Sequence, residues 1–160
     1  DRLSIKKLSN EYGAGHPELS KDGKTLYFSS DMPGGFGGSD LYVSTLDEKG
    51  KWSEPKNLGA NINTEGDELS PYLYKEKNLY FASNGHEGYG GLDVYMVTIE
   101  NIETSSPVLL EAPINSISDD FGILIDPSNV DNGFVTSNRF GGLGDDDIYS
   151  FRIVRQDFSC

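Results

Sequence analysis

Apolar and polar residues alternate with a period of two along most of the chain, a pattern that predicts short β-strands buried on one face. An Asp22-Gly23 pair indicates a tight hairpin turn between the first two strands. No stretch of about ten residues shows the 3.6-residue period of a helix. The sequence therefore predicts an all-β protein. In its first part, strands are expected at residues 18–20, 25–30, 40–46 and 51–58.

This strand pattern recurs about every 53 residues. An apolar strand that ends in Asp or Asn is followed each time by a glycine-rich loop and then by an Asp-x-Tyr sequence. An Ile-Asn pair also recurs, at Ile62-Asn63 and Ile114-Asn115. Because three landmarks keep one spacing, the chain is built from one repeated unit. The apolar strands are residues 26–31, 79–84 and 133–138, and the Asp-x-Tyr sequences begin at Asp40, Asp93 and Asp147.

A repeated unit of four antiparallel strands is typical of a β-propeller blade. We therefore expect a partial propeller of about three blades in residues 1–160. Closed propellers have at least four blades, so we expect completion by further sequence or by a neighbouring chain. The expected parts are an outer strand of a preceding blade (residues 1–13), three blades (14–66, 67–118 and an incomplete 119–153) and a tail or linker to a following domain (154–160).

The amino-acid composition limits the classes of partner that the protein can bind. The net charge is −13, from 13 Lys and Arg against 26 Asp and Glu, which excludes a surface built to follow nucleic-acid phosphates. No apolar run approaches the roughly 18 residues of a membrane-spanning helix, so direct membrane insertion is not expected. Cys160 is the only cysteine, which excludes an internal disulfide.

Two runs carry a family resemblance. Residues 19–30 (Leu-Ser-Lys-Asp-Gly-Lys-Thr-Leu-Tyr-Phe-Ser-Ser) and 90–95 (Gly-Gly-Leu-Asp-Val-Tyr) resemble the WD40-like propeller repeat of the TolB type. Residues 51–59, 137–139 and 144–149 are similar to propeller segments of Bacteroidota cell-envelope proteins of the OmpA family, including the PorE-like proteins associated with type IX secretion. The resemblance covers residues 3–153.

The resemblance implies a periplasmic module associated with the outer membrane. It further implies a non-catalytic binding or scaffold role, in type IX secretion or in peptidoglycan-anchoring machinery. The implied partners are other envelope proteins or ligands linked to the cell wall. Peptidoglycan binding itself belongs to a flanking domain of that family, so it cannot be assigned to any residue of this sequence.

The glycine-rich loops run from strand to strand and lack the Gly-x-Gly-x-x-Gly spacing before a helix, so a nucleotide site is not expected. Acids flank the loops, and Asp145, Asp146 and Asp147 are the best candidates for a Ca²⁺ site, since adjacent carboxylates repel without a cation. The alternative is that Asp and Asn side chains hold the turns by accepting backbone hydrogen bonds. No cofactor is expected beyond this Ca²⁺ alternative.

Catalysis is not expected from the sequence. There is no Gly-x-Ser-x-Gly motif, and neither His16 nor His86 has recognisable Ser and Asp partners. Two alternatives stay open beside the binding module, a glycan-directed enzyme propeller and a Ca²⁺-stabilised structural module.

Aromatic residues fall into two groups. Those that recur at fixed positions of the repeat, among them Tyr80 and Phe134, are expected to pack between blades. Phe36, Tyr89 and Phe140 instead lie in the middle of the glycine-rich loops. We expect these three to form an exposed group that contacts a partner such as a peptide or glycan. The alternative is that they fold back over the edge of the blade.

Overall fold

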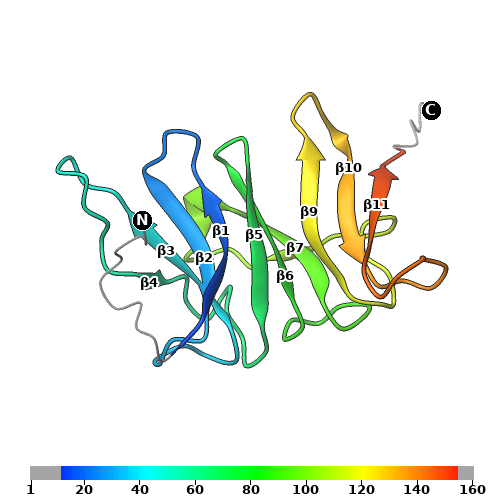
Figure 1. Cartoon of the computed structure of the whole chain (residues 1–160), viewed down its shortest axis with the longest axis horizontal. Helices are drawn as coiled ribbons and strands as arrows, with labels where there is room; N and C mark the ends of the chain where they lie inside the picture. Colours follow the sequence, from blue (N-terminus) through cyan, green and yellow to red (C-terminus); the bar gives the residue numbers. More distant parts are fainter. Residues whose placement is uncertain (1–11, 155–160) are drawn as a thin grey trace.

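The computed structural model describes residues 12–154, which form three antiparallel sheets (Figure 1). The predicted outer strand at residues 1–13 and the tail at 154–160 lie almost entirely outside the described residues. The first sheet is β1 (Ala14–Leu19), β2 (Thr25–Ser30), β3 (Asp40–Thr45) and β4 (Lys56–Asn57). The second is β5 (Glu68–Tyr74), β6 (Asn78–Ser83), β7 (Asp93–Thr98) and β8 (Val108–Leu109). The third is β9 (Asp120–Asp126), β10 (Asn129–Ser137) and β11 (Asp147–Arg152).

Strands that follow each other in sequence are neighbours in each sheet, and the first strands of successive sheets lie side by side, β1 against β5 and β5 against β9. The predicted all-β class and the four-stranded unit are therefore confirmed, and we name the sheets blades 1, 2 and 3. The only described helix is a single 3₁₀ turn, η1 (Ile99–Asn101). No described helix is long and apolar enough to cross a bilayer.

Two strands of blade 1 differ from their predicted bounds by more than one residue. β1 begins at Ala14 rather than at residue 18, because a bulge between Gly15 and Glu18 interrupts the alternation without ending the pairing with β2. β4 is only two residues long. Before it, a single bridge joins Trp52 to Leu46, and Pro55, which has no amide hydrogen, lies between the two pairings.

The bulge of β1 has counterparts in the other two blades. His16, Ser70 and Gly122 occupy equivalent positions in β1, β5 and β9, and all three have positive φ angles of 48°, 51° and 59°. Each lies where the register with the next strand shifts. The first strand of every blade therefore bends at the same place, which keeps these strands adjacent as the blades fan out.

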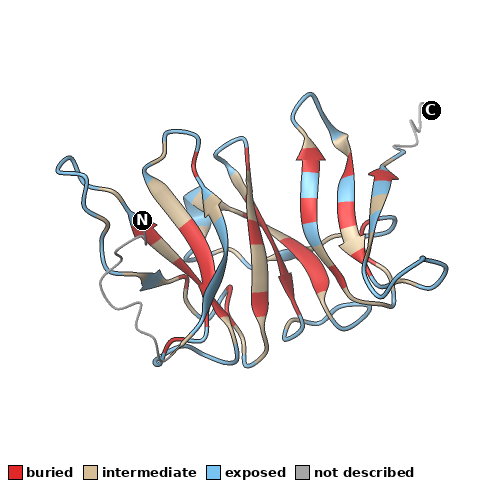
Figure 2. Ribbon diagram, in the orientation of Figure 1, coloured by how far each residue is buried: buried red, intermediate tan, exposed pale blue. Residues whose placement is uncertain are grey.

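The hydrophobic core lies between blades rather than within one sheet (Figure 2). Blade 1 packs on blade 2 through one cluster, and blade 2 packs on blade 3 through a second. Of the repeated aromatic residues, Tyr27, Tyr80, Phe81 and Tyr95 are buried there as predicted. Phe28 and Tyr42 are buried in a separate cluster of blade 1, and Phe134 is half exposed because no described residue covers its side of blade 3. The buried residues of the first cluster are Tyr27, Leu41, Leu58, Ile62, Leu79, Phe81, Tyr95 and Val97.

A connector leads from each blade to the next, residues 58–67 after blade 1 and 110–119 after blade 2. Its isoleucine, Ile62 or Ile114, is buried between the two sheets. The asparagine that follows bonds the main chain of the preceding blade. Asn63 accepts a hydrogen bond from the Leu41 amide at 2.7 Å and donates one to the Leu41 carbonyl at 3.0 Å.

Asn115 makes the same pair of bonds with Val94, at 2.8 and 2.9 Å. Both asparagines are almost completely buried. A buried polar side chain is stable only where its hydrogen-bonding groups are paired. Here the side chain extends the pairing of β3 or β7 beyond the end of the short fourth strand, β4 or β8. The repeated Ile-Asn pair therefore joins adjacent blades.

Replacing Asn63 with alanine should lower the free energy of unfolding by about 2–3 kcal/mol, because the buried Leu41 amide would lose its acceptor. Urea denaturation measures this. Asn61→Ala is the matched control, since Asn61 is exposed in the same connector and donates one bond, to the Glu103 carbonyl, so the change should cost less than about 1 kcal/mol. Equal losses in the two variants would contradict the role given to Asn63.

Glu18 predicts a pH dependence at the junction of β1 and β5. Burial raises the pKa of its carboxyl, nearby Glu76 raises it further, and the hydrogen bond from the Leu73 amide opposes the rise. Since the folded state holds this proton more tightly than the unfolded chain, Glu18 lowers stability as pH rises above the ordinary pKa of about 4.5.

Glu18→Gln should therefore raise the melting temperature at pH 7.5 and leave it almost unchanged at pH 4, with the amide oxygen still accepting from Leu73. Thermal melts at the two pH values measure the difference. Glu48→Gln, on an exposed turn, serves as the control and should change neither value. A larger effect of Glu18→Gln at pH 4 than at pH 7.5 would contradict the raised pKa.

Candidate functional site

The three glycine-rich loops lie at the same end of the sheets as the two connectors, along the lower edge of Figure 1. We call this surface the loop face, made of residues 31–39, 84–92 and 138–146 with the connectors 58–67 and 110–119. Phe36 is 47% exposed, Tyr89 is 51% exposed and Phe140 is fully exposed. The structure thus places the three predicted contact residues in equivalent loops of successive blades, with their rings open to solvent.

A hollow of about 390 Å³ adjoins one of these rings. It is bordered by Tyr89 from its loop and by the connector that follows blade 2, with Ile117 and Glu111 on its rim. Ile117 is almost fully exposed. This hollow therefore combines aromatic, aliphatic and acidic groups at one place on the loop face.

The aspartate at the end of each glycine-rich loop fixes the shape of that loop. Asp93 accepts hydrogen bonds from the amides of Tyr89 at 2.7 Å and Gly90 at 2.9 Å. Asp40 accepts one from the Phe36 amide at 2.7 Å, and Asp147 accepts one from Leu143 at 2.7 Å. Carboxylates that accept several backbone bonds hold a turn, which is the alternative considered for these acids.

A glycine in each loop makes this arrangement sterically feasible. A Cβ atom on Gly35, Gly88 or Gly142 would lie 2.3, 2.2 or 2.1 Å from the carboxylate oxygen of the loop aspartate. Such distances are far below van der Waals contact, so only glycine fits. The glycines at these three positions therefore allow the loop main chain to approach the aspartate closely, which is a structural role and not ligand binding.

A second row of acids joins each loop to the next blade. Asp67 accepts from the Ser39 amide at 2.8 Å, and Asp119 accepts from the Leu92 amide at the same distance. Both acids stand at the start of the following blade. The acids that flank the loops therefore form part of the framework between blades.

The Ca²⁺ candidates do not converge on a common point. Asp147 holds its own loop, while Asp145 and Asp146 are exposed on the surface. Within residues 12–154, no group of three or more His, Cys, Asp or Glu side chains is arranged to hold a metal ion. The Ca²⁺ alternative stays a prediction for these three residues.

Blade 2 holds one buried carboxylate oxygen without a described hydrogen-bond partner, Oδ1 of Asp93. In blade 1, by contrast, both oxygens of Asp40 have partners, since Oδ1 accepts from the Gly37 amide at 3.3 Å and Oδ2 accepts from the Asn57 side chain at 2.7 Å. Burial and then the charge of Asp93 raise the pKa of the Tyr95 hydroxyl to about 12. This hydroxyl therefore stays protonated and donates to the Glu87 carbonyl at 3.0 Å, which adds a further tie to the loop.

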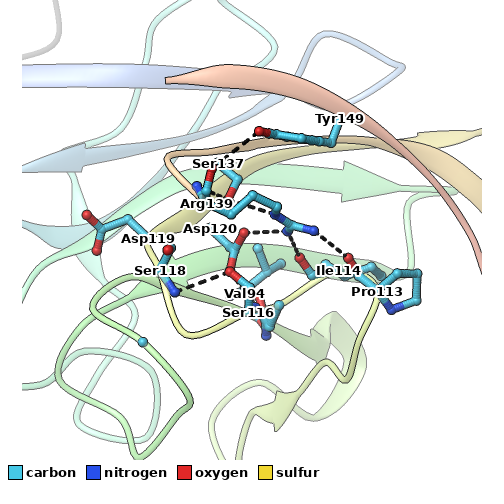
Figure 3. A network of polar contacts seen from close by, with 12 residues as sticks. Val94, Pro113, Ile114, Ser116, Ser118, Asp119, Asp120, Ser137, Arg139 and Tyr149 are labelled. Carbon is cyan, nitrogen blue, oxygen red and sulfur yellow. Dashed lines mark hydrogen bonds and ion pairs between the residues drawn. The ribbon is translucent and has the colours of Figure 1, made fainter. Parts of the chain in front are cut away.

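Arg139, which was not among the residues predicted from the sequence, forms the polar network shown in Figure 3. Its Nη2 lies 2.5 Å from Oδ1 of Asp120 and 2.6 Å from the carbonyl oxygen of Ile114. Its guanidinium also lies over the Tyr149 ring, 5.0 Å from the centroid. Because Asp120 is completely buried, the arginine neutralises a charge that would otherwise be costly.

The corresponding place between blades 1 and 2 is filled by His86. Its Nε2 lies 2.8 Å from the carbonyl oxygen of Ile62, and its ring centroid is 5.2 Å from that of Tyr95. The counterpart of Asp120 is Glu68, which accepts from neutral donors only, the Thr64 amide and hydroxyl and the Ser83 hydroxyl. Arg139 and His86 thus each join a connector to the blade that follows it. In the sequence, only the acid that recurs at equivalent positions, Glu68 and Asp120, could have pointed to these junctions.

Within residues 12–154, His16 makes a contact that resembles part of a catalytic pair. Its Nδ1 lies 3.0 Å from Oγ of Ser29, beside a hollow of about 270 Å³. Ser29 is buried, and its hydroxyl also lies 3.3 Å from the Gly15 carbonyl oxygen. The described contacts give His16 no carboxylate partner, so the pair lacks the third group that orients a catalytic histidine.

No protein-family model matches the chain, and no curated protein matches it. Among solved structures, the chain is similar to prolyl oligopeptidase B from Galerina marginata bound to a 35mer hydrolysis and macrocyclization substrate, with a TM-score of 0.55 and 19% identity over 90% of this chain. A second structure of that enzyme, with a 25mer macrocyclization substrate, has a TM-score of 0.55 and 18% identity over 89% of this chain. A thermostable family-43 glycoside hydrolase follows, with a TM-score of 0.47 and 16% identity over 97% of this chain and 58% of its own.

The chain spans about a fifth of the prolyl oligopeptidase chains, 19% and 18% of them. At these identities the similarity shows the fold alone. Together with the three sheets it establishes that this chain is a partial β-propeller. None of the three structures is a TolB-type or OmpA-family protein, so that resemblance stays a prediction.

Asp93→Ala should loosen the loop at residues 84–92 and lower the free energy of unfolding by about 2–3 kcal/mol, because the Tyr89 and Gly90 amides would lose their acceptor. Urea denaturation measures the loss, and limited proteolysis should show faster cleavage within this loop. Asp145→Ala, in an exposed loop segment, is the control and should stay within about 0.5 kcal/mol of the parent. Unchanged stability and proteolysis in Asp93→Ala would contradict the assigned role.

Proposed function

We propose that this propeller segment is a non-catalytic binding or scaffold module whose partner-contacting surface is the loop face. One observation carries the proposal. Three loops present Phe36, Tyr89 and Phe140 to solvent at the same end of the molecule. Each loop is held in shape by an aspartate that fits there only because the residue packed against it is a glycine. Exposed aromatic rings on a rigid support are suited to partner binding, since little conformational entropy is lost.

The charge of the loop face indicates the kind of partner. Its loops and connectors contain one arginine and no lysine, and Arg139 is already paired with Asp120. Carboxylates beside aromatic rings attract Lys and Arg side chains through charge and through cation–π contact. A basic segment of another protein therefore fits this surface best. The acids of this surface that are not bonded into the framework between blades are Asp31, Glu65, Glu87, Glu111, Asp145 and Asp146.

The location and the biological role rest on the resemblance to Bacteroidota envelope propellers. On that basis the module belongs to the periplasm, is associated with the outer membrane and serves type IX secretion or peptidoglycan-anchoring machinery. Its partners are then other envelope proteins or ligands linked to the cell wall. Fractionation of cells that carry the gene, with the chain detected by antibody, tests this location.

Replacing Phe36, Tyr89 and Phe140 together with alanine tests the binding surface. The immobilised chain is incubated with an outer-membrane extract, and bound proteins are compared between the parent and the triple variant. We expect the specifically bound proteins to fall at least about tenfold in the variant, the effect of losing 1.4 kcal/mol or more of binding free energy. Binding should also weaken in 0.5 M salt, because screening shortens the reach of the acidic groups.

The control is the double variant Leu19→Ala and Val130→Ala, which removes exposed apolar side chains at the opposite end of the sheets. It should bind as the parent does. Thermal melts of all three chains establish that the loop substitutions leave the fold intact. Equal binding by the parent and the triple variant would overturn the assignment of the loop face.

A further inference from the structure

Blade 3 presents an apolar sheet face that no described residue covers. Phe134 pairs with Leu124 across β10 and β9, and Thr136 pairs with Ile148 across β10 and β11, so these side chains point to the same side of the sheet. We call Leu124, Phe134 and Ile148 the open face. Phe134 is 50% exposed and Ile148 is 76% exposed. This is the right-hand side of the molecule in Figure 2.

The residues of blades 1 and 2 that are equivalent to Phe134 and Ile148 are buried, and those equivalent to Leu124, which are Glu18 and Tyr72, are half-buried. Leu41 and Val94 stand in place of Ile148 and are 0% and 1% exposed, while Tyr27 and Tyr80 stand in place of Phe134 and are both 6% exposed. In each of those blades, the connector and the next sheet cover them. Phe134 and Ile148 are thus apolar residues at positions that, in blades 1 and 2, are buried between two sheets.

Within the described residues, the main-chain amide and carbonyl of Ile148 also lack the hydrogen bonds that their counterparts make in blades 1 and 2. In blades 1 and 2, the amide and carbonyl of Leu41 and of Val94 bond a connector asparagine. Ile148 occupies the equivalent position on β11, the edge strand of its sheet, and receives no such bond from a described residue. An unpaired strand edge beside an apolar face favours pairing with another chain segment.

We propose that the open face binds a further unit of this same repeat, through a connector of the form Leu-x-x-x-Ile-Asn-Ser/Thr-x-x-Asp. Both connectors of the chain have this form, at residues 58–67 and 110–119. The isoleucine of this additional connector fills the space between the two sheets. Its asparagine forms hydrogen bonds with the amide and the carbonyl of Ile148, and its aspartate accepts a hydrogen bond from the amide of Asp146. That amide is the counterpart of the Ser39 and Leu92 amides, which bond Asp67 and Asp119.

A second copy of the described residues does not fit this role. Its isoleucines, Ile62 and Ile114, are buried in its own blade junctions, and its asparagines are bonded there. To engage the open face of another molecule, it would have to break one of those junctions. The occupant is therefore an additional unit with a connector of its own.

An extended chain tests the proposal. A copy of residues 101–154 is added after Val154, in register with the repeat. It supplies a fourth strand for blade 3 (the copy of β8), one further connector and the three strands of a further blade. Hydrogen exchange is followed at the Ile148 amide in the parent 1–160 chain and in the extended chain. We expect the exchange to slow by about 100-fold or more in the extended chain, to a rate close to that of the Val94 amide. Binding of an apolar dye to the open face should fall at the same time.

The matched control is the same extension in which the copies of Ile114 and Asn115 are changed, Ile114→Ser and Asn115→Ala. It should leave the Ile148 amide as exposed to exchange as in the parent. A second variant guards against failure of the extension to fold. Phe134→Asp should leave the stability of the parent within about 0.5 kcal/mol, as for an exposed site, whereas Tyr80→Asp should unfold it.

Three results would overturn the proposal. One is an extended chain that folds without protecting the Ile148 amide. Another is a large loss of stability in the parent with Phe134→Asp, which would show that the face is already covered. The third is a parent chain that forms dimers by light scattering, with the Ile148 amide protected and with Phe134→Asp restoring the monomer. That result would make a second copy the occupant.

Discussion

The burial of a connector between two sheets is the constraint on which the rest of this molecule depends. Ile62 and Ile114 each fill the space between two apolar sheet faces, where an amide of the preceding blade, that of Leu41 or Val94, is buried beyond the end of the short fourth strand. Asn63 and Asn115 supply the missing partners. An unpaired buried amide costs about 1–3 kcal/mol, so the asparagine beside each isoleucine is what permits the sheets to pack this closely.

The loop face follows from the same junctions. Each glycine-rich loop is held from within by its aspartate and from the next blade by a second acid, as Asp93 and Asp119 do for the loop at residues 84–92. These aspartates therefore hold the loops, whereas the exposed aromatic rings of the loops are available to contact a partner. Tyr89 has its amide bound to Asp93 while its ring is exposed, so one residue serves both purposes.

Much of this architecture was predictable, because the repeat places each residue type three times. The strands β2 at 25–30 and β6 at 78–83, and the burial of Tyr27 and Tyr80, follow from alternation and spacing. Phe134 was expected to be buried by the same rule and is not, since burial depends on a neighbouring sheet rather than on the strand itself. The network of Arg139 was missed because Asp120, Ile114 and Tyr149 are distant in sequence from one another and meet only at the junction.

The sequence by itself determined the all-β class, the repeated unit and the loops that carry Phe36, Tyr89 and Phe140, because these depend on local alternation and on fixed spacing. The tertiary structure alone decided what each polar residue does. Asp147 stood out in sequence as one of three adjacent acids, yet its carboxylate holds the Leu143 amide. Asn115 stood out only as a repeated landmark, yet it joins two blades. A polar side chain takes its role from the partners that folding brings within about 3 Å, and sequence spacing does not contain that distance.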